Sequence, residues 1–140
     1  MTVTLATLFT AVVSILAILV LFWTGFRVGG MRGKHNIQAP AVSGHPEFDR
    51  AYRVQMNTME QFVIFLPLLW LASTFFQTLP LLAGAFGLVW IVGRVVYAQA
   101  YMADPAKRGL GFGISALANL GLLILALVGI VHDWMLLNAA

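Results

Sequence analysis

The chain has 140 residues, of which 61 % are hydrophobic and only 9 % are charged. Soluble domains are about 45–50 % apolar and about 25 % charged, so soluble globular and disordered proteins are excluded. The composition therefore indicates an integral membrane protein. Membrane topology is the first explanation for the net charge of +3, and we expect no nucleic-acid partner. Because the chain has no cysteine, any thiol in its chemistry must come from a substrate.

Four apolar segments have the length of a membrane helix, which needs about 20 residues. We expect one all-α domain over residues 1–140, a bundle of four transmembrane helices at about 3–28, 47–76, 81–102 and 105–131. Gly29-Gly30 should end the first helix. Pro46-Glu47 should begin the second, because proline suits a first turn and acids suit the positive helix end. Asp104-Pro105 should cap the fourth in the same way.

The basic residues predict how the chain crosses the membrane. Most of them surround the first and third loops, namely Arg27, Arg32, Lys34, Arg50, Arg53, Lys107 and Arg108. The second loop and both termini carry no lysine or arginine. The positive-inside rule then places the first and third loops in the cytoplasm and both termini outside it. The compact loops favour a bacterial inner membrane.

Polar residues at helical spacing mark one face of the second helix and one face of the third. They are Arg53, Asn57 and Glu60 on the second helix, and Arg94, Tyr97 and Tyr101 on the third. Counted from the turn between these helices at about 1.5 Å per residue, Glu60 lies about 28 Å along and Tyr97 about 27 Å along. The two faces should therefore come level towards the cytoplasmic side, where Arg108 begins the fourth helix.

These residues predict a pocket with several cations, one buried carboxylate, an amide and two phenols. Such a pocket suits a small zwitterion, because arginine binds carboxylates through paired hydrogen bonds and Glu60 could take an ammonium group. A structural alternative stays open, in which Arg53 and Glu60 neutralise each other, or pair with Arg94, and hold the bundle together. The three histidines lack metal-ligand spacing, and we expect no metal site.

Two segments resemble a known family. Residues 48–60 read FDRAYRVQMNTME, and residues 90–101 read WIVGRVVYAQAY, followed by DPAKR at 104–108. The first segment resembles the second-helix signature of the membrane-associated proteins in eicosanoid and glutathione metabolism (MAPEG). The second is similar to the microsomal glutathione S-transferase type 3 branch of that family. The resemblance extends over all four predicted helices.

The resemblance implies a homotrimer of four-helix subunits that uses glutathione as co-substrate. It implies a glutathione site between neighbouring subunits, near the cytoplasmic side, with a lipid-facing cleft for an apolar substrate. The glutathione contacts that it implies are Arg32, Arg53, Gln55, Asn57, Glu60, Tyr97 and Tyr101. Arg108 matches the arginine proposed to stabilise the glutathione thiolate. The pocket argument above adds Arg94 to the candidate contacts.

Two functions follow as hypotheses. The first is a glutathione-dependent transferase or peroxidase that acts on apolar electrophiles or lipid hydroperoxides. The second is a non-enzymatic lipid-binding or scaffold protein of the same fold. The second is motivated by Gln61 and Phe62, which stand where several relatives carry a tyrosine, and by Pro67, which lies further from Glu60 than the family's proline.

Overall fold

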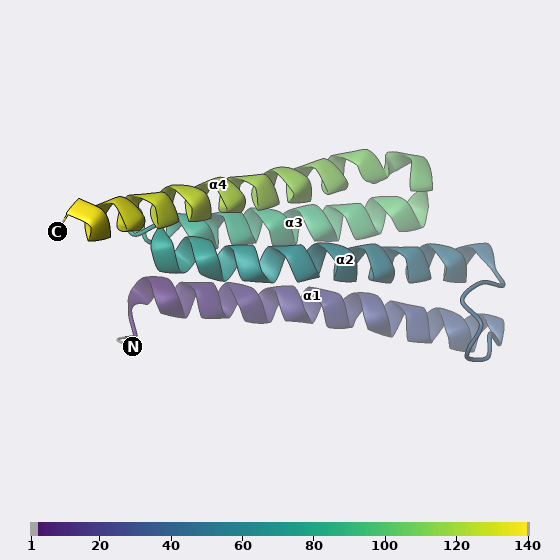
Figure 1. Cartoon of the computed structure of the whole chain (residues 1–140). Helices are drawn as coiled ribbons and strands as arrows, with labels where there is room; N and C mark the ends of the chain where they lie inside the picture. The colour runs from purple at the N-terminus through teal and green to yellow at the C-terminus, as the bar shows by residue number, and fades with distance from the viewer. Residues whose placement is uncertain (1–2, 140) are drawn as a thin grey trace.

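The computed structural model describes residues 3–139, and most of them are helical. α1 spans Leu5–His35, α2 Pro46–Phe75, α3 Leu82–Ala103 and α4 Gly109–Ala139, and a short 3-10 helix, η1, spans Pro105–Arg108. The four long helices lie side by side, and both ends of the described chain lie opposite the α1–α2 loop (Figure 1). Each is long and apolar enough to cross a membrane. The predicted all-α, four-helix membrane fold is confirmed.

Two helices extend beyond their predicted ends. The break predicted at Gly29-Gly30 is wrong, because α1 continues through both glycines to His35. A glycine inside a helix lowers its stability by only about 1 kcal/mol. α1 ends instead at Asn36, which adopts the left-handed conformation with φ 53° and donates its backbone N–H to the Arg32 carbonyl. α4 likewise continues to Ala139 rather than to about residue 131.

The predicted starts of the second and fourth helices are confirmed in their capping residues. Pro46 opens α2, and the His45 ring nitrogen accepts a hydrogen bond from the Glu47 backbone N–H at 3.2 Å. The Asp104 carboxylate accepts a hydrogen bond from the Ala106 backbone N–H at 3.0 Å. The fourth helix differs in one respect, since its first turn is the 3-10 turn η1. This turn places Arg108 directly before α4.

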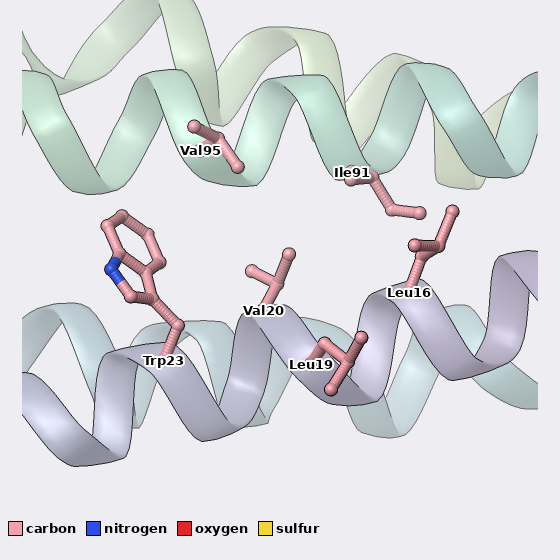
Figure 2. Close-up of a pocket in the computed structure, with 6 residues that line it drawn as sticks. All are labelled: Leu16, Leu19, Val20, Trp23, Ile91 and Val95. Carbon is pink, nitrogen blue, oxygen red and sulfur yellow. The ribbon is translucent and has the colours of Figure 1, made fainter.

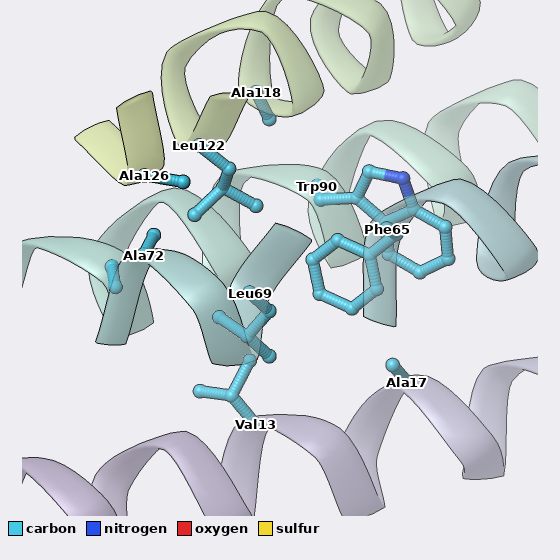
Figure 3. Close-up of a cluster of buried hydrophobic side chains, with 10 residues drawn as sticks. Val13, Ala17, Phe65, Leu69, Ala72, Trp90, Ala118, Leu122 and Ala126 are labelled. Carbon is cyan, nitrogen blue, oxygen red and sulfur yellow. The ribbon is translucent and has the colours of Figure 1, made fainter. Parts of the chain in front are cut away.

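The main apolar core lies between all four helices. α2 and α3 each contact the other three helices. The core alternates large side chains with alanines, as Figure 3 shows, which lets the helices interdigitate closely. Its buried members are Val13, Ala17, Phe65, Leu69, Ala72, Ala83, Trp90, Ala118, Leu122 and Ala126. Large apolar side chains on the outer faces of all four helices remain exposed in the single chain, as expected for a protein that faces lipid.

Glycines bring α3 and α4 into backbone contact near the end where the third loop lies. A Cβ on Gly111 of α4 would collide with the backbone of Tyr97 on α3. A Cβ on Gly93 would similarly collide with Ser115. Small residues at helix interfaces are the usual means of close approach in membranes. This contact holds η1, and with it Arg108, beside the tyrosine face of α3.

Candidate functional site

Arg94 joins α2 and α3 at one end of the bundle. We call this the polar end, because it carries the polar residues Arg53, Asn57, Glu60, Tyr97, Tyr101 and Arg108. Its side chain is fully buried, and its Nη2 donates to Oδ1 of Asn57 at 3.1 Å and to Oγ1 of Thr58 at 2.9 Å. Its guanidinium carbon lies 4.1 Å from the centre of the Tyr97 ring, within the range of a cation–π interaction. Nε and Nη1 are buried and have no hydrogen-bond partner among residues 3–139.

Asn57 links this buried arginine to the surface of α2. Its Nδ2 donates to Oε2 of Glu60 at 3.2 Å. The prediction of a buried carboxylate is wrong for the single chain, because Glu60 is exposed on the surface of α2. Arg53 is exposed as well. Within the described residues, no ion pair joins Arg53, Glu60 or Arg94 to a partner, so the structural alternative does not form here.

The tyrosine face of α3 opens into a cavity of about 200 Å³, lined by Asn57, Tyr97, Arg108 and Phe112. The Tyr97 and Tyr101 rings lie 5.6 Å apart, centre to centre. The guanidinium carbon of Arg108 lies 6.0 Å from the centre of the Tyr101 ring. The structure therefore brings Asn57 of the second helix and Tyr97 of the third together with Arg108, whereas Arg53 and Glu60 do not line this cavity.

Two of the expected glutathione contacts lie elsewhere on the chain. Gln55 is two residues before Asn57 and so points about 200° away around α2. Its side-chain nitrogen lies 3.2 Å from the position of a Cβ on Gly25 of α1. Arg32, near the end of α1, packs over the Phe48 ring at 4.8 Å. Arg32 and Gln55 thus belong to the α1 side, and this chain does not bring them to the cavity.

Three side chains near the site were not singled out from the sequence. Thr58 is fully buried and accepts a hydrogen bond from Arg94, and Phe112 lines the cavity. Asn119 on α4 donates to the Gln61 side-chain oxygen at 3.2 Å. An amide within the apolar run of the fourth helix is itself a signal of an interhelical contact. Gln61 therefore has a packing role in this chain.

An apolar groove runs along the outside of the bundle between α1 and α3 (Figure 2). It encloses about 290 Å³ and is lined by Leu16, Leu19, Val20, Trp23, Ile91 and Val95. Trp23 also packs against the small cluster that contains Val54, Tyr97 and Ala98. The groove therefore adjoins the polar end on its α1 side.

His35, His45 and Glu47 meet at the α1–α2 loop, which their sequence spacing did not predict. Their ligand-type atoms all lie within 4.8 Å of one another. The two imidazole rings are stacked at 3.5 Å, and Glu47 accepts from His35 at 2.8 Å and from Lys34 at 2.6 Å. The lysine already neutralises the one carboxylate, so these contacts favour closure of the loop over binding of a divalent cation.

Comparison with known proteins agrees with this architecture. The chain is 38 % identical to microsomal glutathione S-transferase 2 of Homo sapiens over 126 residues, which cover 89 % of this chain and 84 % of that protein. It is 36 % identical to an uncharacterized protein of Synechocystis sp. over 124 residues, or 89 % of each chain. It is 34 % identical to leukotriene C4 synthase of Bos taurus over 125 residues, which cover 89 % of this chain and 82 % of that protein.

The likeness extends from the first helix to the fourth. The profile of the MAPEG family matches residues 10–128, which include the polar faces of α2 and α3, the η1 turn and most of α4. The named relatives are a type 2 transferase and a leukotriene C4 synthase, so the particular likeness to type 3 stays a prediction. The chain is an integral, multi-pass membrane protein that belongs to the MAPEG family.

Proposed function

We propose that this protein is a membrane-embedded, glutathione-dependent transferase that acts on apolar electrophiles. The observation that carries the proposal is the cavity lined by Asn57, Tyr97 and Arg108, which gathers polar groups from α2, α3 and η1. The relatives named as a glutathione S-transferase and a leukotriene C4 synthase support the same class of activity. The proposal extends to peroxidase activity on lipid hydroperoxides, which would use the same thiol.

The chemistry of the polar end fits glutathione, which carries two carboxylates, one ammonium group and one thiol. The exposed carboxylate of Glu60 suits the ammonium group, and the exposed guanidinium of Arg53 suits a carboxylate. The Tyr97 and Tyr101 hydroxyls offer further hydrogen bonds. The bilayer would concentrate the apolar substrate, while glutathione would enter from the cytoplasm.

Arg108 is the residue that we assign to the thiol. A free cysteine thiol has a pKa of about 8.5, and a nearby cation lowers it. The Arg108 guanidinium, at the edge of the cavity, would stabilise the thiolate. In transfer, the sulfur forms a bond to the electrophilic carbon and the leaving group departs with its electron pair. In peroxide reduction, two glutathiones become one disulfide as the hydroperoxide becomes an alcohol and water.

We further propose that a neighbouring subunit completes the site, within a homotrimer. Asn57 of α2 lines the cavity and holds Glu60, whereas Gln55 and Arg32 lie on the α1 side. A single chain therefore offers two halves of the expected contact set. A second copy that presents its α1 side to the α2–α3 face of the first would join them. The cytoplasmic position of this end follows from the predicted topology.

The second candidate function is non-enzymatic lipid binding, and the apolar groove between α1 and α3 (Figure 2) favours it. An acyl chain could lie against its six apolar side chains without any polar contact. On this alternative, the polar end stabilises the bundle and glutathione has no effect on the protein.

The test is turnover of glutathione and an apolar aryl halide by the purified protein. Replacing one electrostatic stabiliser of a transition state lowers turnover by about 10²–10³. We expect this loss in Arg108→Ala, with glutathione binding retained. Lys107→Ala is the matched control, because Lys107 shares the η1 turn, pairs with Asp104 at 3.9 Å and does not line the cavity. Equal turnover of wild type and Arg108→Ala would contradict the role of Arg108, and no turnover by wild type would favour lipid binding.

A further inference from the structure

We infer that Arg94 is a positioning residue, which acts on glutathione through Asn57 rather than by touching it; this rests on the proposed function. The sequence placed Arg94 among the direct contacts because it shares a helix face with Tyr97 and Tyr101. The structure gives this arginine a different place, behind the cavity wall. Its effect on the ligand must then pass through the side chains that it holds.

Burial separates Arg94 from the ligand. Its side chain is fully buried, and the cavity is lined by other residues, namely Asn57, Tyr97, Arg108 and Phe112. A ligand in this cavity would meet the Asn57 amide and the Tyr97 ring first. Both of these are in contact with Arg94.

The hydrogen bonds of Arg94 decide which way the Asn57 amide points. A guanidinium can only donate, and an ionised carboxylate can only accept. The Asn57 oxygen accepts from Arg94 at 3.1 Å, and its nitrogen donates to Glu60 at 3.2 Å. A flipped amide would set its NH₂ against the arginine and its oxygen against the carboxylate. Arg94 therefore fixes the amide orientation that holds Glu60, the carboxylate we assign to the ammonium group.

The shape of arginine suits this position better than lysine does. One guanidinium nitrogen donates to both Asn57 and Thr58 on α2, while the carbon of the same group lies over the Tyr97 ring on α3. A lysine ammonium could supply one or two of these hydrogen bonds but not the planar face. Arg94→Lys should therefore hold the Asn57 amide in its orientation only in part, and Arg94→Met should not hold it at all.

The experiment measures the Kd for glutathione, the KM for the apolar electrophile and kcat at saturating glutathione. We expect Arg94→Lys to weaken glutathione binding about tenfold, as for loss of a hydrogen bond to a charged group, with kcat and the electrophile KM within about threefold. Arg94→Met should bind more weakly than Arg94→Lys. Arg27→Lys is the matched control, because Arg27 also lies over an aromatic ring, that of Trp23 at 5.2 Å, but stands on α1 outside the cavity. It should bind glutathione as wild type does.

A double-mutant cycle identifies the route of the effect. If Arg94 acts through Asn57, adding Arg94→Lys to the Asn57→Ala variant should raise the Kd for glutathione by less than about threefold. If Arg94 contacts glutathione directly, the two losses should multiply, which would overturn the inference. Unchanged glutathione binding by folded Arg94→Lys would also overturn it. Wild-type protein that does not bind glutathione would instead contradict the proposed function itself, so the two failures are distinct.

Discussion

Two regions of the bundle differ in how completely one chain buries their side chains. One lies around Phe65 and Trp90, and the other lies around Asn57 and Arg94. In the first, which Figure 3 shows, all four helices contribute buried side chains. In the second, a buried guanidinium retains two donors without partners in the described chain, and the carboxylate beyond it is exposed. The apolar packing of the first region is complete within one chain, and its one buried polar atom without a hydrogen-bond partner among residues 3–139 is the Trp90 indole nitrogen. On the proposed function, the exposed Glu60 carboxylate of the second region gains its partner from glutathione.

The largest expected effect is a loss of stability without a loss of glutathione binding, on substitution of Phe65 in the first region. The buried Phe65 ring stacks on Trp90 at 4.0 Å, and truncation of a buried phenylalanine costs about 3–5 kcal/mol. Phe65→Ala should lower the free energy of unfolding by this order, while the folded fraction keeps its glutathione affinity within about threefold. Thermal unfolding and ligand titration in the same detergent measure both quantities. Val63→Ala, an exposed position on the same helix, should change neither. A large loss of affinity with little loss of stability would contradict the division between the two regions.

The next effect should be a loss of glutathione affinity without a loss of stability. Because Glu60 is exposed and we assign it to the ammonium group, Glu60→Gln should weaken glutathione binding about tenfold or more, as for loss of a charged hydrogen-bond partner, without lowering the unfolding temperature. Asp133→Asn at the other end of the bundle is the control for loss of one carboxylate. Unchanged affinity in Glu60→Gln would remove this residue from the site.

The smallest expected effect tests whether a second copy completes the polar end. Gln55→Ala removes one neutral hydrogen-bond partner, typically worth about 0.5–1.5 kcal/mol, so glutathione affinity should fall by about threefold to tenfold. Gln99→Ala, exposed on α3, should leave it unchanged.

Mixed assemblies then show whether Arg32 acts across a subunit boundary. Arg32→Ala and Glu60→Gln chains are co-expressed with different affinity tags and purified through both tags. If each site uses Glu60 of one chain and Arg32 of its neighbour, some sites contain both native residues and should recover the wild-type Kd. Failure of any site to recover would indicate that both residues act within one chain.

Hydrophobic run length was enough to predict the fold and its four helices, because apolar segments of membrane length have few other solutions. Cap chemistry predicted the starts at Pro46 and Asp104. The end of α1 was not predictable from Gly29-Gly30, because glycine only weakens a helix. The left-handed Asn36 that ends it depends on the loop that follows.

The candidate site was predictable where helical spacing defines a shared face. Asn57, Tyr97 and Arg108 do meet at one cavity. Periodicity gives direction but not depth of burial, so it could not tell that Glu60 is exposed and Arg94 covered. Thr58 was missed because its hydroxyl carries no charge that would mark it as unusual within a membrane helix. His35 and His45 were missed as neighbours because the loop that brings them together has no regular period.

The most direct test of the central claim, that the polar end is a glutathione site, is thermal unfolding of the purified protein as glutathione concentration rises. A ligand that binds only the folded protein stabilises it by RT ln(1 + [L]/Kd), or about 2.7 kcal/mol at a hundredfold excess over Kd. S-hexyl-glutathione and free cysteine are measured alongside. The account predicts a rise that follows this relation for glutathione and S-hexyl-glutathione, and none for cysteine. An unfolding temperature that stays constant up to millimolar glutathione would contradict it.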